Sequence, residues 1–245
     1  MEQRFHLRFT GSTTTDSGVA LGAFVQMRSD DDTGAGTAAT LNAPQFTIGM
    51  GDLMVRGGHI NGAMDAAPGL FAGSVGLTGL SFANVVTGFQ THDYSDGGEG
   101  TNGLEVSYNA NGLGLTVSNE HDGDTEIMAS YTMSGVTVAA AMSNTTTATD
   151  AEWLVTAGMA LGNVNVGLAT AETVAGNGST TLSVSGEAAP GLTYSAYVAR
   201  DEAQAQESAA GVGIVYDLGG GASFRGGIAG THGRTRADAG IQFTF

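Results

Sequence analysis

The chain has no cysteine, no lysine and only three prolines among its 245 residues. The absence of cysteine excludes disulfides and thiolate metal sites. There is also no apolar run of roughly 18 residues, which excludes a transmembrane helix. Because only eight arginines stand against 24 acidic residues, the formal net charge is −16. An electrostatic field of that sign makes nucleic acid an unfavourable partner.

Glycine and small polar residues replace much of the charge and the large apolar side chains of an ordinary soluble domain. The chain contains 40 glycines, and charged residues make up 13% of it, against about 25% in typical soluble proteins. This composition is typical neither of a soluble domain with a packed apolar core nor of a helical membrane protein.

Apolar and small polar residues alternate along most of the chain. In the closing stretch "ADAGIQFTF", Ile241 and Phe243 alternate with Gly240, Gln242 and Thr244. A period of two indicates β-strands with one apolar and one polar face. Tight turns that contain glycine, such as "NANG" and "MSG", alternate with longer polar connections such as "EHDGDTE" and "GTHGRTR". The sequence therefore predicts strands joined alternately by short and long connections.

Two architectures could cover the apolar faces of these strands. In a soluble sandwich or solenoid the apolar faces would pack on one another around a dry core. In an outer-membrane barrel they would face lipid, and the small polar faces would line a water-filled interior. The polar faces nearly lack the charged residues that soluble sheets present to solvent. We therefore predict an all-β fold, a transmembrane antiparallel β-barrel that spans residues 1–245 as a single domain.

Residues 57–103 interrupt the strand pattern. This segment carries apolar residues without a clear period of two. A structureless connection of this length inside a compact domain usually has a function.

Three stretches carry a resemblance to a known family: "FTGSTTTDSGVALGAF" near the start, "YDLGGGASFRGGIAG" near the end, and the terminal strand with its final Phe245. They resemble trimeric general-diffusion porins of the Gram-negative outer membrane, of the alphaproteobacterial type. The resemblance implies a barrel of sixteen strands, a homotrimer and a third loop, here residues 57–103, folded into the lumen. About fifteen strands are visible in this chain, so we expect that the family's first strand is missing from it.

The resemblance also implies the function. A porin of this type is a passive diffusion channel for small hydrophilic solutes and ions, selects them by size and charge, and is not an enzyme. Its surroundings are outer-membrane lipid and lipopolysaccharide. With the excess of acidic residues we expect a mild preference for cations. Two alternatives remain open, namely a substrate-specific outer-membrane channel of the same fold and a secreted soluble β protein.

Charged residues in two regions are candidates for the pore. Because Phe5, Leu7 and Phe9 must face lipid, the period of two turns Arg4 and Arg8 inward. The same argument places Arg28 and Arg56 on the pore wall, with the rim as the alternative. The acidic residues of the inserted segment are Asp65, Asp93, Asp96 and Glu99. The resemblance implies that wall arginines and loop acids oppose one another across the constriction.

Other chemistry has little support in the sequence. Asp30, Asp31 and Asp32 could bind calcium, since clustered carboxylates in a loop suit a hard cation, but a solvated acidic rim is the alternative. The five histidines are scattered, and neither HExxH nor GxSxG occurs. The sequence therefore contains no signature of a zinc protease or of a serine hydrolase.

Overall fold

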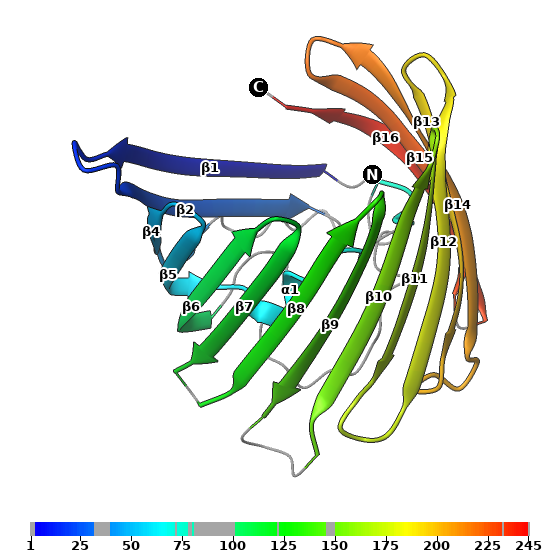
Figure 1. Ribbon diagram of the computed structural model, residues 1–245. Helices are drawn as coiled ribbons and strands as arrows, with labels where there is room; N and C mark the ends of the chain where they lie inside the picture. The colour runs from blue at the N-terminus through cyan, green and yellow to red at the C-terminus, as the bar shows by residue number, and fades with distance from the viewer. Residues whose placement is uncertain are drawn as a thin grey trace. The chain divides into compact units, whose positions relative to one another are not determined.

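The computed structural model describes residues 3–31, 40–71, 73–77, 80, 101–121, 123–145, 150–231 and 233–244. Most of these residues lie in strands, and one short helix, α1 (Gly62–Asp65), follows β5 (Figure 1). The strands are β1 (Gln3–Thr14), β2 (Ala20–Asp31), β3 (Thr40–Leu41), β4 (Gln45–Met50), β5 (Leu53–Ile60), β6 (Thr101–Ala110), β7 (Leu113–Glu120), β8 (Thr125–Met133), β9 (Val136–Asn144), β10 (Glu152–Leu161), β11 (Val164–Glu172), β12 (Gly178–Ala189), β13 (Leu192–Asp201), β14 (Ser208–Gly219), β15 (Ala222–Thr231) and β16 (Arg234–Phe243). Over the described ranges, no helix is long and apolar enough to cross a membrane.

The strands are antiparallel and follow one another in the order of the chain. In the described part of the chain, fifteen strands lie on one path from β1 to β16, and the two-residue β3 pairs with β2 beside this path. The predicted count of about fifteen strands is therefore confirmed. The residues fall into two compact units. The first holds β1 to β7, α1 and the start of β8, and the second holds the rest of β8, nearly all of β9 and β10 to β16.

Short turns close the hairpins as the glycine pattern predicts. Between β6 and β7, Asn111 and Gly112 have φ angles of 51° and 83°, as the favoured two-residue hairpin turn requires. One prediction is wrong. The stretch "GTHGRTR" is not a long connection, because Thr231 of β15 pairs with Arg234 of β16 and the strand ladder continues into it.

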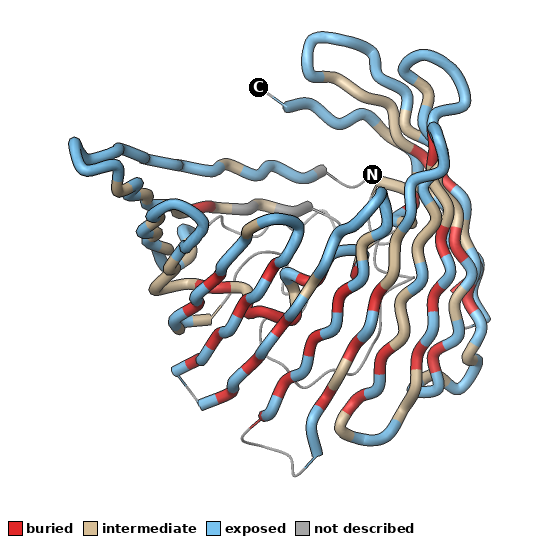
Figure 2. The backbone as a smooth tube through the Cα atoms, in the orientation of Figure 1, coloured by how far each residue is buried: buried red, intermediate tan, exposed pale blue. Residues whose placement is uncertain are grey.

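Exposure along the strands is inverted relative to a soluble sheet. In β7, Val117 is 45% exposed while the neighbouring Ser118 is 1% exposed; in β12 the values are 49% for Leu182 and 5% for Ser183. Figure 2 shows the same alternation of buried and exposed positions along β6 to β9. The exposed face is the apolar one, as expected where that face meets hydrocarbon.

A soluble sandwich requires the apolar faces to share a dry interior, and the described strands do not have one. Val138 of β9 is 47% exposed and Phe243 of β16 is 65% exposed. The buried positions of these strands are instead largely serine, threonine, alanine, glycine and carboxylate residues. The inverted pattern therefore contradicts the sandwich and agrees with the predicted barrel.

The segment between β5 and β6 is shorter than residues 57–103. Strand β5 continues through Ile60 and β6 begins at Thr101, because residues 57–60 pair with residues 101–104. The connection itself is residues 61–100. Of these, residues 81–100 lie outside the described part of the chain.

Candidate functional site on the polar face of the sheet

In the first unit, the strand register brings the predicted wall arginines onto the polar face. Arg8 of β1 lies opposite Gln26 of β2, and Arg56 of β5 lies opposite Glu105 of β6. Residues directly opposite one another in antiparallel strands point to the same face. Arg4 shares the face of Arg8, since the two are four residues apart, and Phe5 and Phe9 are exposed on the other face. The parity argument for these arginines therefore agrees with the register.

Arg56 does not stand alone on this face. Its guanidinium Nη1 donates a hydrogen bond to Oε1 of Glu105 and forms an ion pair with it. Glu105 is buried, and Arg56 is about one-third exposed. A buried carboxylate normally requires such a partner. The charge of Arg56 is thus balanced by a neighbouring wall residue.

The chain after β5 is attached to the polar face of the first unit. The backbone N–H of Met64 donates to Oε2 of Glu126 in β8 over 2.6 Å, and the N–H of Ala63 donates to Oγ of Ser118 in β7 over 2.9 Å. Residues 62–64 are buried there. Backbone N–H groups at the start of a helix lack partners within the helix, so a carboxylate suits this place.

Asp65 is the one predicted loop acid among the described residues. It is half-buried at the end of α1 and accepts a hydrogen bond from Nδ2 of Asn61 over 3.5 Å. Asp93, Asp96 and Glu99 lie outside the described residues. Whether these acids oppose the wall arginines stays a prediction.

The following residues of the same connection lie on the polar face of the second unit. Thr156 of β10 donates a hydrogen bond to the carbonyl of Pro68, and Ser195 of β13 donates to the carbonyl of Ser74 over 2.7 Å. The N–H of Leu77 donates to Oδ2 of Asp238 in β16 over 2.9 Å. Pro68, Ser74 and Leu77 are therefore bound to the polar face of strands that are far away in the sequence.

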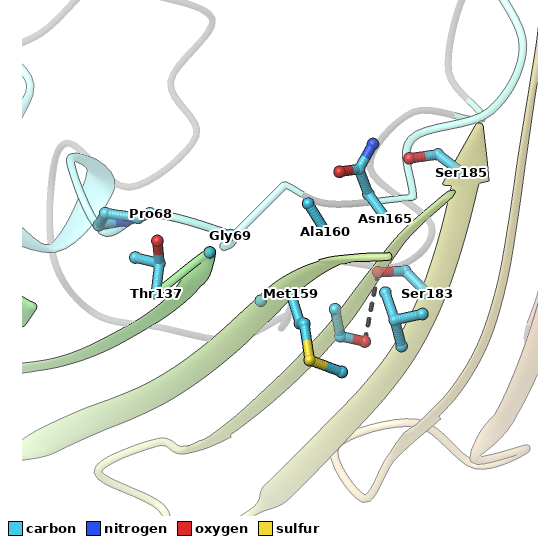
Figure 3. A pocket seen from close by; sticks show the side chains of 12 residues that line it. Pro68, Gly69, Thr137, Met159, Ala160, Asn165, Ser183 and Ser185 are labelled. Atoms are coloured by element: carbon cyan, nitrogen blue, oxygen red, sulfur yellow. Dashed lines mark hydrogen bonds between the residues drawn. The ribbon is translucent and has the colours of Figure 1, made fainter. Parts of the chain in front are cut away.

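A cavity of about 310 Å³ opens in the second unit beside Pro68 and Gly69 (Figure 3). Its polar side chains are neutral, and Oγ of Ser183 donates to the carbonyl of Gly167 over 3.4 Å. The lining residues are Pro68, Gly69, Gly135, Thr137, Gly158, Met159, Ala160, Asn165, Val166, Gly167, Ser183 and Ser185. Hydroxyl and amide groups of this kind can bind a neutral polar solute.

The structure describes the predicted calcium ligands only in part. The backbone of Asp30 and Asp31 lies in β2, their side chains lie outside the described part of the chain, and Asp32 lies outside it entirely. The side chain of Arg28 is likewise outside, although its backbone pairs with His6 on the polar face. In the described part of the chain, no group of three His, Cys, Asp or Glu residues could hold a metal ion.

Several charged residues of the polar face were missed by the sequence analysis. The buried carboxylates of the described strands are Glu105, Glu120, Glu126, Glu152 and Asp201. Further arginines on the polar face of the second unit are Arg225, Arg234 and Arg236. The same period of two would have found them, because each alternates with neighbours on the apolar face. Glu105, for example, lies between the exposed Leu104 and Val106.

Comparison with known proteins identifies the family. A family model described as Gram-negative porin matches residues 1–236. The chain belongs to the Gram-negative porin family. A porin from Fuscovulum blasticum is 29% identical over 266 residues, which cover all of this chain and 91% of that relative. Two mutants of Rhodopseudomonas blastica porin match with TM-scores of 0.84 and 0.83 at 24% and 23% identity, covering 100% of this chain and 91% of each.

The family settles the general function and the location. This porin is a protein of the bacterial outer membrane that forms a diffusion channel, and its fold is the antiparallel β-barrel of the blastica porin. The family is one of channels rather than of enzymes. The alternative of a secreted soluble β protein is wrong, because the chain is an outer-membrane porin and exposes the apolar faces of its strands.

Proposed function

We propose that this porin passes small hydrophilic solutes and ions by passive diffusion, selects them by size and charge, prefers cations mildly, and catalyses no reaction. The observation that carries the proposal is the inverted exposure of the strands. Apolar side chains lie on the exposed face, whereas carboxylates and arginines lie on the opposite face. In a channel the charges that line the pore determine which ions enter.

The preference for cations is supported by the balance of charge. The whole chain carries a formal net charge of −16. On the polar face, Arg56 is paired with Glu105, so this arginine offers a permeating anion little uncompensated positive charge. Glu120, Glu126 and Glu152 add carboxylates to the same face of their strands.

The pore is proposed to be narrowed by the inserted segment, which folds inward and comprises residues 61–100 once the paired ends of β5 and β6 are set apart. In this proposal Arg4, Arg8, Arg28 and Arg56 form the basic wall and Asp65, Asp93, Asp96 and Glu99 form the acidic side of the constriction. The hydrogen bonds from Ala63 and Met64 to Ser118 and Glu126 support an inward position for the start of the segment.

The partners and the metal are also proposals. We infer a homotrimer in contact with outer-membrane lipid and lipopolysaccharide, and a calcium ion at Asp30, Asp31 and Asp32. The apolar side chains exposed on the strands are consistent with contact to lipid or to another subunit. The size of the detergent-solubilised protein tests the trimer, and a calcium titration of its melting temperature tests the ion.

Recordings from planar lipid bilayers test the function itself. Purified folded protein should insert in discrete conductance steps, and the reversal potential in a salt gradient should have the sign of a cation preference. Absence of conductance steps would contradict the channel. A reversal potential of the opposite sign would show that the arginines dominate the pore field.

A substrate-specific channel of the same fold is the second candidate, and the neutral cavity beside Pro68 favours it. Neutral polyhydroxylated solutes should then block the conductance in a saturable manner. The variant Asn165→Leu should abolish that block while leaving the conductance to salt in place. Block that rises linearly with solute concentration would leave general diffusion as the function.

A further inference from the structure

Residues 73–77 lie on a part of the second unit's polar face where the wall has almost no side chains. The strand register puts Gly213 of β14 opposite Gly227 of β15, and Gly227 opposite Asp238 of β16. The face of this wall is therefore built from glycine on two adjoining strands, with one carboxylate beside them. We call Gly213 and Gly227 the glycine seat.

The backbone of the segment touches the glycine seat. A Cβ atom added to Gly227 would lie 2.8 Å from the backbone nitrogen of Gly76, and one added to Gly213 would lie 3.0 Å from that same nitrogen. Both distances are too short for a Cβ atom to be accommodated without movement of the segment. A large side chain at either position would therefore displace the segment from the wall.

The segment also needs a glycine where it meets the wall, at Gly76. Gly76 has a φ of +80°, a conformation that side chains disfavour. A Cβ at Gly76 would also lie 2.5 Å from Oδ1 of Asp238 and 2.9 Å from Cβ of Leu80. Asp238 accepts the hydrogen bond from Leu77 immediately after this turn.

Apolar side chains before and after Gly76 also pack against the wall. Val75 and Leu80 are buried in a cluster with Tyr197, Ala209 and Ala229, whose positions belong to the polar faces of β13, β14 and β15. This is a small dry patch on a face that is otherwise polar. Burial of Val75 and Leu80 there favours the seated segment over one that is free in water.

We propose that Asp238 and the glycine seat are positioning residues for permeation, because they hold residues 73–77 in one place against the wall of the pore. The inference rests on the proposed narrowing of the pore by the inserted segment. A segment fixed at this place leaves a constant opening, so the open-channel current is steady. A segment released from the wall enters the permeation path at intervals and interrupts the current.

The variant Gly227→Leu tests the seat, with Gly230→Leu as the matched control. Gly230 belongs to the same strand but lies on the exposed face, where an added Cβ has its nearest neighbour at 4.0 Å. Gly227→Leu should lower the single-channel conductance, since its side chain pushes the segment away from the wall. Gly230→Leu should conduct like the parent protein. Equal conductance of all three proteins would overturn the proposal.

The variants Asp238→Ala and Asp238→Asn test the hydrogen bond from Leu77 to Asp238. Loss of a hydrogen bond to a charged group corresponds to about a tenfold to hundredfold change in an equilibrium. Asp238→Ala should therefore spend roughly ten to a hundred times longer in interrupted states than the parent protein. Asp238→Asn keeps an acceptor oxygen and should restore most of the steady current. An unchanged frequency of interruptions in Asp238→Ala contradicts the positioning role.

A cysteine pair tests the position of the segment even if a seat variant fails to fold. A Cβ at Gly213 would lie 3.0 Å from Cβ of Val75, and a disulfide needs about 3.5–4.5 Å, so a small shift suffices. The chain has no cysteine of its own. Val75→Cys with Gly213→Cys should oxidise in the folded porin and retain a steady current. Val75→Cys with Gly230→Cys should stay reduced, because Gly230 faces the other way.

The outcomes separate this inference from the proposed function. A parent protein that does not conduct at all contradicts the channel. If the parent protein conducts steadily but the variant Val75→Cys with Gly213→Cys stays reduced, the proposed position of residues 73–77 is contradicted and the channel function is not.

Discussion

Glu126 accepts a hydrogen bond from the backbone N–H of Met64 over 2.6 Å, although the two residues are 62 positions apart. The carboxylate is buried in β8, and the N–H belongs to the first turn of α1. This bond connects the wall of the first unit to the segment that carries Asp65. Glu126 is therefore placed to orient the start of the inserted segment.

Replacement of Glu126 should loosen the start of the inserted segment. A hydrogen bond to a charged group contributes about 1.5–3 kcal/mol. Glu126→Ala should lower the free energy of unfolding by about that amount, and Glu126→Gln by less, because the amide keeps an acceptor oxygen. Heat-induced loss of β-structure in detergent measures the effect. An equal loss in both variants would show that the negative charge, and not the hydrogen bond to Met64, is what matters.

The pair formed by Arg56 and Glu105 predicts a change in ion selectivity with opposite signs for its two members. Arg56→Gln leaves the carboxylate of Glu105 without its balancing charge, so the reversal potential should shift toward stronger cation preference. Glu105→Gln leaves the arginine unbalanced and should shift it toward anions. The double variant should lie close to the parent protein, since it removes one charge of each sign.

Stability checks belong with the same experiment. Removal of one partner from a buried ion pair costs about 3–5 kcal/mol, and partial exposure of Arg56 reduces this figure. The melting temperature of each variant must therefore be recorded beside its selectivity. Selectivity shifts of the same sign in both single variants would contradict the assignment of the pair to the pore wall.

The alternation along β12 predicts that position in the strand decides the effect of a new charge. Leu182 is exposed on the apolar face, and Ser185 lies three residues further on the polar face. An arginine facing the middle of the membrane costs about 2–4 kcal/mol. Leu182→Arg should therefore reduce folding into lipid vesicles, whereas Ser185→Arg should fold normally and change conductance. Normal folding of Leu182→Arg would contradict the lipid-facing orientation of β12.

The period of two explains which features could be predicted from the sequence. It assigns each strand residue to a face, so the faces of Arg8 and Phe9 followed from the alternation alone. It would equally have assigned Glu105 and Glu120 to the polar face. It says nothing about which residue of the inserted segment meets which residue of the wall. The bond from Leu77 to Asp238 joins positions 161 residues apart, and no local pattern encodes such a distance.

Helix α1 and the exact ends of the inserted segment could not be predicted from the sequence either. A helix of four residues is too short to display a period of 3.6. Residues 57–60 escaped assignment to β5 because two glycines, Gly57 and Gly58, remove the apolar positions by which a strand is recognised. The ladder with β6 nevertheless continues through them, since backbone hydrogen bonds do not depend on side chains.

The turn at Asn111 and Gly112 offers a prediction about the folding of a single hairpin. Gly112 has a φ of 83°, and a residue with a Cβ atom pays roughly 1–2 kcal/mol to adopt the left-handed region. Gly112→Val should therefore destabilise the β6–β7 hairpin by at least that amount and slow the folding of the porin into vesicles. Gly158→Val is a control on backbone entropy, because Gly158 lies within β10 at a φ that other residues adopt and an added Cβ would have its nearest neighbour at 3.9 Å. If Gly158→Val slows folding as much as Gly112→Val, the turn conformation is not the cause.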